Sequence, residues 1–157
     1  MFVVTTMLLR TEILATLIIT TVLHQGQTNP AIGFSATISK DTHLGDNQAI
    51  PYDRILTNIG NGYDKWSGHF TAPLKGLYVF SCTVMAVNEN YLAVMMVKNG
   101  HVMAYTHSNP SAWESGTISV VLAMAKGNKV WIRRYHGARL IHGKYNLFSG
   151  YLISTQI

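Results

Sequence analysis

The sequence predicts an all-β protein built as a sandwich or jelly roll, and three observations support this. Past its N-terminal segment, the chain of 157 residues shows no apolar pattern of helical period and helix length. Short apolar runs follow one another, separated by Gly, Pro, Asn and Asp turn signals. Hydrophobic residues make up 48% of the chain and charged residues only 12%, so we expect one domain with a sizeable core and no general disorder.

Residues 1–27 are interpreted as a secretory signal peptide, and residues 28–157 as the folded domain. An apolar run at 13–23 follows Arg10 and ends in a polar stretch, which is the layout of such a leader. Cleavage is expected between Leu23 and Asn29. The alternative is a membrane anchor that starts at Phe2. Arg10 and Glu12 interrupt that anchor and leave a run shorter than the ~20 residues that cross a bilayer. We therefore expect a secreted, extracellular protein with no membrane span after cleavage.

Eight or more short strands are expected in the folded part, at the spacing of a sandwich or jelly roll. The first covers 32–39, with Phe34, Ala36 and Ile38 on one face, and a short strand near 52–58 follows an irregular stretch. The other expected strands cover 66–71, 77–87, 92–98, 101–106, 116–125, 129–135 and 146–154. Asn99-Gly100 predicts a two-residue hairpin turn, and Gly127-Asn128 predicts a second tight turn.

The run from Leu77 to Ala86 is almost entirely apolar or small, which predicts a strand buried on both faces. Pro73 and Gly76 mark the turn that leads into it. Cys82 lies inside this run and is the only cysteine, so no intramolecular disulfide can form. We interpret it as a buried structural cysteine. An intermolecular disulfide and a catalytic nucleophile are the alternatives.

Several spaced landmarks resemble the globular head of the C1q family. In the family a strand ends at Ala-Pro and the next opens at Gly-x-Tyr-x-Phe; here these positions are Phe70, Ala72, Pro73, Gly76, Tyr78 and Phe80. The segments 32–36, 61–64 and 148–152 resemble the family's opening pattern, the stretch before this motif and the closing Phe-Ser-Gly-Phe-Leu strand. The resemblance covers Ala31 to the C terminus. It implies a ten-stranded jelly roll, related in fold to tumour necrosis factor, that assembles as a homotrimer.

A homotrimer would also cover the second face of a strand that is apolar on both sides. The chain contains no collagen-like repeat, and it resembles the stalkless secreted heads of molluscs and other invertebrates. That resemblance implies innate-immune pattern recognition, a lectin-like binding of microbial polysaccharides or lipopolysaccharide. The alternative is a cytokine-like ligand for a protein receptor.

An enzyme is not expected, because no paired carboxylates, Ser-His-Asp arrangement or phosphate loop can be assembled from the sequence. Nucleic-acid binding is not expected either, because the basic residues form no long stripe.

The densest basic and aromatic cluster, at 133–145, is the expected ligand-binding face. Its candidate residues are Arg133, Arg134, Tyr135, His136, Arg139, His142, Lys144 and Tyr145. Arginine offers a planar fork of donors to phosphate or carboxylate, and tyrosine rings stack on sugar faces. The formal net charge of +5 favours anionic partners. The alternative is a solvated loop between two strands.

A second candidate loop, 107–114, contains Trp113 and Glu114. Trp113 is either an exposed sugar platform or a cap on the core. Some members of the family hold calcium through acidic and amide oxygens in the equivalent loop, but this loop supplies Glu114 and Asn109 and no aspartate, against the six to eight oxygens that calcium takes. The histidines show no HExxH spacing. We therefore expect no cofactor, with calcium left as an open alternative.

Overall fold

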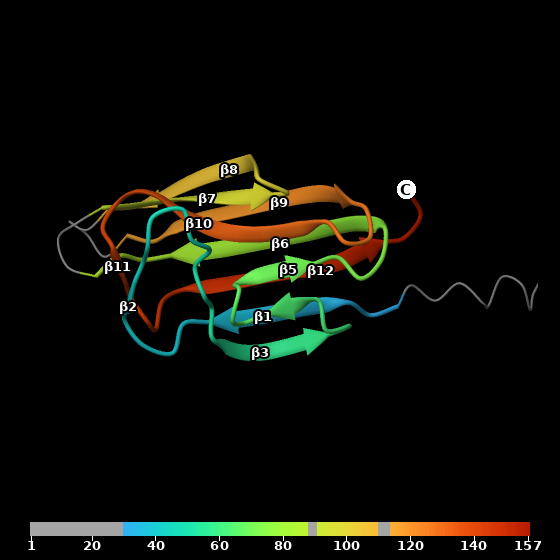
Figure 1. Cartoon of the computed structure of the whole chain (residues 1–157), viewed down its shortest axis with the longest axis horizontal. Helices are drawn as coiled ribbons and strands as arrows, with labels where there is room; N and C mark the ends of the chain where they lie inside the picture. Colours follow the sequence, from blue (N-terminus) through green and yellow to red (C-terminus); the bar gives the residue numbers. More distant parts are fainter. Residues whose placement is uncertain (1–29, 88–90, 110–113) are drawn as a thin grey trace, which may run out of the picture. The chain divides into compact units, whose positions relative to one another are not determined.

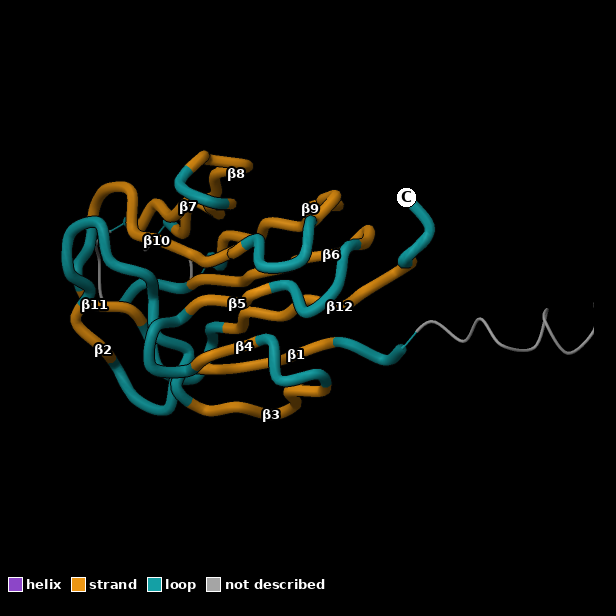
Figure 2. The backbone as a smooth tube through the Cα atoms, turned by 45° about the vertical axis from the view of Figure 1, so that its right-hand side comes forward, coloured by secondary structure: helices purple, strands orange, loops and turns teal. Residues whose placement is uncertain are grey.

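The computed structural model describes residues 30–87, 91–109 and 114–157. The leader predicted for residues 1–27 and the candidate Trp113 lie outside these ranges. The folded unit begins at Ala31. All of its regular secondary structure is β-strand, which confirms the predicted fold class (Figure 2).

Two five-stranded antiparallel sheets face each other and form the sandwich (Figure 1). The first sheet has the order β3 (Arg54–Ile59), β1 (Gly33–Thr37), β12 (Leu147–Ser154), β6 (Gly76–Val84) and β9 (Gly116–Met124). The second sheet has the order β4 (Tyr63–Asp64), β5 (His69–Thr71), β10 (Lys129–Gly137), β7 (Leu92–Lys98) and β8 (His101–Ser108). The two sheets confirm the ten-stranded prediction. A small additional sheet pairs β2 (Thr42–His43) with β11 (Leu140–Ile141) at one end of the sandwich, where several long loops gather (Figure 1).

A cluster of aromatic rings fills the space between the two sheets. Phe34 of the first sheet stacks on Tyr63 of the second, with ring centroids 4.7 Å apart and ring planes 2° from parallel. The Phe34 ring also lies 5.0 Å from Phe70 and meets Phe148 edge-on at 4.8 Å. Phe80 completes the cluster 5.3 Å from Phe70. All five side chains are buried, so these rings join the sheets into one core.

Strand β6 is buried on one face only, so the prediction of burial on both faces is wrong for the single chain. Tyr78, Phe80 and Cys82 point into the core, whereas the alternate residues Val79 and Ser81 are half-buried. The continuous apolar run concealed this alternation, because small and apolar residues occupy the outer positions as well.

The predicted strand 66–71 is also wrong in its first half. Residues 65–68 form a turn between β4 and β5, because the carboxylate of Asp64 accepts hydrogen bonds from the backbone N–H groups of Trp66, at 3.0 Å, and Ser67, at 3.3 Å. Gly68 ends the turn with a φ of 71°, a conformation that favours glycine. The sequence prediction did not include the short strands β2, β4 and β11.

The Cys82 thiol is expected to be unreactive in the folded protein. Its side chain is 1% exposed, and burial raises its pKa to about 12, so almost no thiolate is present at pH 8. Iodoacetamide labelling followed by mass spectrometry should show an unmodified native protein and complete modification in guanidinium chloride. Rapid labelling of the native protein, or a dimer cross-linked through Cys82, would contradict this interpretation.

Gly150→Ala is expected to destabilise the protein by about 1–3 kcal/mol, the usual cost of overpacking a core. A Cβ atom at this position would lie 2.5 Å from Cδ1 of Phe80 and 2.9 Å from Cε1 of Phe34, and both rings are buried. Urea unfolding of the variant measures the change. Ser149→Ala, on the neighbouring half-buried position, is the matched control and should unfold close to the wild type. Equal stability of the two variants would show that the core relaxes around the added methyl group.

Candidate functional site

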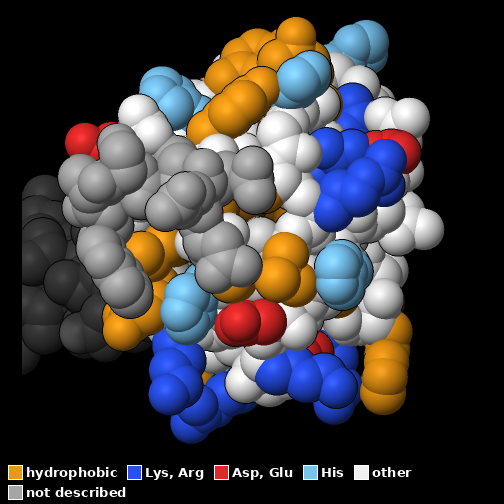
Figure 3. Space-filling model, turned by 90° about the vertical axis from the view of Figure 1, so that its left-hand side faces the viewer, with side chains coloured by type: hydrophobic (Ala, Val, Ile, Leu, Met, Phe, Trp, Pro, Cys, Tyr) orange, Lys and Arg blue, Asp and Glu red, His pale blue; other side chains and the backbone are white. Residues whose placement is uncertain are grey.

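The expected ligand segment 133–145 does not form one loop. Residues 133–137 complete β10, and β11 pairs with β2, so much of the segment belongs to the sheets. Arg133 lies by itself, and the other candidate side chains separate into three groups: Arg134 and Arg139 near Asp46, the rings of Tyr135 and His136, and a group beside Asp41. Figure 3 shows the end of the sandwich that carries the small sheet, with Lys and Arg side chains in separate patches and histidines between them.

Asp46 gathers two of the candidate arginines. Its carboxylate forms ion pairs with the guanidinium groups of Arg134 and Arg139. Hydrogen bonds from the two arginines, of which that from Arg139 has the larger effect, hold the pKa of Asp46 below its usual value. Arg134 also donates to the carbonyl of Gly137 at 2.9 Å, and its side chain is only 12% exposed, whereas that of Arg139 is 56% exposed. Arg139 is therefore the member of this group that a ligand can reach.

Arg133 is held within the second sheet. It stands opposite Met95 in the register of β10 and β7, and its guanidinium lies 3.4 Å from the sulfur of that residue. The Nε atom of Arg133 is buried and has no hydrogen-bond partner among the described residues. Arg133 thus contributes to the packing of the sheet face more than to an open ligand surface.

Tyr135 and Tyr105 form the walls of a hollow on the outer face of the second sheet, which we call the tyrosine cleft. Tyr135 sits at a bulge in β10, where the register with β7 shifts between Arg134 and His136. Its ring meets Tyr105 of β8 edge-on, with centroids 5.2 Å apart. Ala93 of β7 lies between them, and its small side chain, together with Thr106 and His107, leaves a hollow of about 360 Å³. Both tyrosine rings are more than half exposed.

His136 extends the aromatic surface beside the tyrosine cleft. Its ring stacks on Tyr91 at 5.8 Å and 10° from parallel, and its Nδ1 atom is hydrogen-bonded to the Tyr91 hydroxyl. Gly137 allows the backbone at the end of β10 to lie close to the backbone of Tyr91, because a Cβ atom at position 137 would lie 2.1 Å from the carbonyl oxygen of Tyr91. The N–H of Ala138 donates to that carbonyl at 2.7 Å. The backbone around the cleft is therefore closely fixed.

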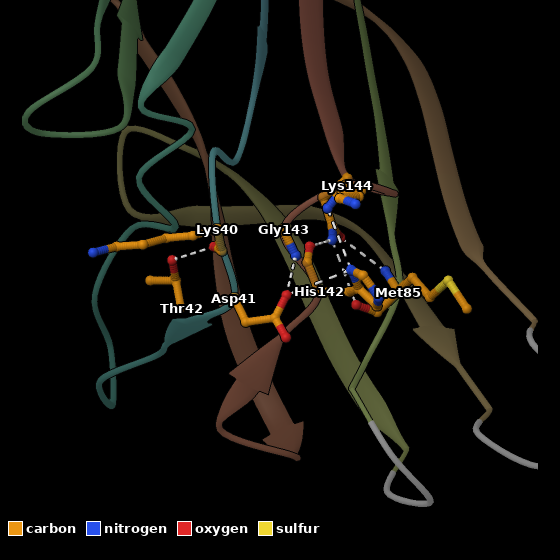
Figure 4. Close-up of polar contacts among 8 residues, drawn as sticks. Lys40, Asp41, Thr42, Met85, His142, Gly143 and Lys144 are labelled. Atoms are coloured by element: carbon orange, nitrogen blue, oxygen red, sulfur yellow. Dashed lines mark hydrogen bonds and ion pairs between the residues drawn. The ribbon is translucent and has the colours of Figure 1, made fainter.

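The third group surrounds Asp41, in the loop before β2 (Figure 4). One oxygen of its carboxylate accepts a hydrogen bond from the N–H of Gly143 at 2.8 Å and lies 3.5 Å from Nδ1 of His142. The N–H of Lys144 also points to that imidazole nitrogen, at 3.3 Å. Buried Asn146 joins this loop to Met85: its side-chain oxygen accepts from the N–H of Met85 at 2.8 Å, and its side-chain nitrogen donates to the carbonyl of His142. Asp41 and Asn146 thus hold His142 and Lys144 in one place.

Tyr145 lies apart from the tyrosine cleft. Its ring packs edge-on against His142 at 4.7 Å and is half exposed. On its other side it lines a hollow of about 440 Å³ with Thr83, Met85 and Ser115. The structure therefore does not bring Tyr145 together with Tyr135, although both were expected on one ligand face.

The second candidate loop is described only in part. The side chain of Glu114 is exposed, and its carbonyl accepts a hydrogen bond from Ser108 at 2.8 Å. In residues 30–87, 91–109 and 114–157, no three His, Cys, Asp or Glu side chains approach closely enough to hold a metal ion.

The sequence interpretation missed Tyr105 and Tyr91, and it placed His107 only in the second candidate loop, apart from the ligand face expected at 133–145. In the structure β8 continues to Ser108, so Tyr105 and His107 occupy alternate positions of one strand and lie on the same face. The expected strand ended at residue 106, which concealed this alternation. The sequence did not reveal which strand would lie beside them, because Tyr135 is brought close only by the pairing of β7 with both β8 and β10.

No helix long and apolar enough to cross a membrane occurs within the described ranges. The model of the C1q domain family matches residues 33–153 of this chain. Complement C1q tumor necrosis factor-related protein 3 of mouse and of human are each 33% identical to it over 129 residues, covering 78% of this chain and 51% of theirs. Caprin-2 of zebrafish is 34% identical over 129 residues, covering 78% of this chain and 14% of its own. The chain thus spans about half the length of the first two relatives.

Solved structures show the same fold. The globular domain of zebrafish complement 1qA superposes with a TM-score of 0.66 at 22% identity, over 79% of this chain and 98% of that domain. The Eiger TNF of S. frugiperda superposes with a TM-score of 0.65 at 10% identity, over 82% of this chain and 96% of its own. These neighbours confirm the C1q and tumour necrosis factor jelly roll, and a trimer is consistent with them. With most of its length matched by the family model, the chain belongs to the C1q domain family.

Proposed function

We propose that this protein is a secreted recognition protein that binds microbial glycans, including lipopolysaccharide, and that it acts as a homotrimer. Membership of the C1q domain family supports the general class. The observation that supports glycan binding is the tyrosine cleft, an open aromatic hollow of about 360 Å³ on a rigid sheet. Binding sites on rigid sheets lose little conformational entropy when a ligand binds.

The chemistry of the tyrosine cleft suits a sugar ring. The exposed faces of Tyr105 and Tyr135 offer flat apolar surfaces, and their hydroxyl groups can donate and accept hydrogen bonds. His107 adds a ring nitrogen at the rim. A sugar presents the same combination, an apolar face edged by hydroxyl groups. Few precisely placed polar groups in a largely apolar hollow are typical of small-ligand sites.

Two exposed cations supply contacts for the acidic groups of a microbial polymer. Arg139 is more than half exposed although it is paired with Asp46, and Lys144 is exposed at the same end of the sandwich. Arg134, Arg139 and Asp46 together carry one net positive charge, so the group attracts phosphate or carboxylate. These contacts add long-range attraction, and the cleft provides the sugar contact.

The homotrimer is supported by the outer face of the first sheet. Strands β1, β6, β9 and β12 contain no charged side chain. Tyr151 and Val121, which flank Val79 on that face, are 55% and 58% exposed. Depletion of charge and exposure of apolar groups are typical of the core of a subunit interface. A trimer would present three copies of a weak site and so raise the avidity for a repetitive surface.

Secretion and signal cleavage remain predictions that rest on the leader expected at residues 1–27, outside the described ranges. The alternative function is a cytokine-like ligand that binds a protein receptor in grooves between subunits. The fold is consistent with this alternative, because the TM-score of 0.65 with Eiger TNF is close to that of the complement domain. A glycan array separates the two functions, because a receptor ligand would bind no glycan or whole microbe at trimer-forming concentration.

Tyr135→Ala is expected to weaken glycan binding by about fivefold, since a stacked aromatic contact contributes on the order of 1 kcal/mol. Tyr135→Phe keeps the ring and should retain most of the affinity. Binding of array-positive glycans is measured by biolayer interferometry, with circular dichroism as the folding control. Equal affinity of wild type and Tyr135→Ala would move the sugar site away from the cleft.

Arg139→Ala and Lys144→Ala are each expected to weaken binding of lipopolysaccharide and to make it less sensitive to salt. Each removes one exposed cation, and screening acts on such exposed charges. Affinity is measured between 50 and 500 mM NaCl, roughly the range over which the Debye length falls from about 14 to 4 Å. Lys126→Ala, in the turn between β9 and β10, is the charge-matched control and should behave as wild type. Unchanged binding of both variants would place the anion contact elsewhere.

A further inference from the structure

The most exposed aromatic ring among the described residues lies outside the tyrosine cleft, on the turn between β4 and β5. The side chain of Trp66 is 85% exposed. The turn that carries it is rigid, because the Asp64 carboxylate caps its backbone and the Asp64 carbonyl accepts from the N–H of Gly68 at 2.9 Å. A large apolar ring held in water by a fixed turn gains little packing among the described residues, and such exposure is informative about a binding surface.

Trp66 forms one wall of a groove of about 520 Å³, and the loop from residue 43 to residue 51 forms the other. This loop is tied to β10, because the N–H of Ile50 donates to the carbonyl of Ile132 at 2.8 Å. The two walls also touch: a Cβ atom on Gly68 would lie 2.6 Å from the carbonyl oxygen of Ile50. The groove is therefore preformed, and its volume lies within the roughly 300–1,000 Å³ of small-ligand sites.

The Trp66 groove is lined by apolar and polar residues, and none of its lining residues is Asp, Glu, Lys or Arg. Its polar members are His43, Asn47, Gln48, Ser67 and His69. Neither carboxamide, of Asn47 or of Gln48, is hydrogen-bonded to another residue in the described ranges. Burial lowers the pKa of His69, which keeps this imidazole neutral at pH 7. Asp46, in the same loop, is occupied by its two arginines and does not line the groove.

We propose that the Trp66 groove binds a neutral sugar unit of a glycan, as a second subsite on the same subunit as the tyrosine cleft. The indole face would stack on the sugar ring, and the two carboxamides would bind its hydroxyl groups. The inference rests on the proposed glycan-binding function and adds a site and a ligand class to it.

Other ligand classes fit the groove less well. The ammonium group of Lys65 lies 4.8 Å from the centroid of the Trp66 ring, so a cationic ligand would meet a like charge there. An extended peptide usually pairs with the edge of a sheet, but the edge strand beside the groove, β4, has only two residues. Lys65 approaches the Trp66 ring but does not line the groove, and the lining residues carry no carboxylate, ammonium or guanidinium group, which favours an uncharged ligand with many hydroxyl groups.

The test uses the full mature protein and three uncharged trisaccharides: mannotriose, maltotriose and chitotriose. Each is titrated while the indole N–H signals are followed by NMR, with the Trp66 signal assigned from its loss in Trp66→Phe. We expect one of the sugars to shift the Trp66 signal in a manner insensitive to salt. Trp66→Ala should weaken that binding about tenfold, whereas Trp66→Phe should weaken it less.

Matched variants separate this inference from the proposed function. Gln48→Ala should also lower the affinity for the neutral sugar, and Tyr135→Ala should leave this affinity unchanged. Asn47 is not substituted, because its φ of 58° suits few other residues. Binding that Tyr135→Ala removes and Trp66→Ala leaves intact would overturn the second subsite and leave the proposed function standing. Absence of binding to every sugar, on the array and in the titrations, would overturn both. Trp66→Ala is expected to fold normally, because its side chain is almost fully exposed, and a melting curve checks this.

Discussion

The close contact of Gly150 with Phe80 and Phe34 is the constraint on which the rest of the structure depends. Gly150 lies in β12, the central strand of the first sheet, and no larger residue could stand there without displacing buried rings. This contact lets the Phe34 ring lie flat against Tyr63 of the opposite sheet. The aromatic core therefore sets how the two sheets face each other. Because the loops leave from these strands, their positions follow from the same packing.

On this framework, specific polar contacts position the surface groups. Asn146 fixes the loop of His142 and Lys144, Asp64 fixes the turn of Trp66, and Asp46 restrains two arginines. Each of these groups uses backbone or charge-assisted hydrogen bonds, so the surface is ordered before any ligand arrives. A preorganised surface of this kind suits a recognition protein, which contributes no chemistry and depends on the shape and polarity that it presents.

The two sheets expose faces of different character, and the proposed subunit contact and the proposed ligand sites lie on different sheets. Four of the five strands of the first sheet, β1, β6, β9 and β12, contain no charged side chain, which suits contact with other subunits. The second sheet and its adjoining loops carry the tyrosine cleft and the Trp66 groove. If a trimer covers only the uncharged face, both hollows stay exposed to solvent, because they lie on the other sheet and its edge. Weak sites repeated in this way match a repetitive microbial surface.

The sequence by itself determined the fold class, most strand positions and the buried state of Cys82, because alternation along a strand and Gly or Asn in turns are local properties. The sequence did not reveal which residues lie beside Tyr135 or beside Trp66 in space. Tyr105 reaches Tyr135 only across the intervening strand β7, and the groove at Trp66 needs a loop some twenty residues earlier in the chain. Both hollows join segments that are distant in sequence, and strand pairing and side-chain packing, which no local pattern encodes, decided them.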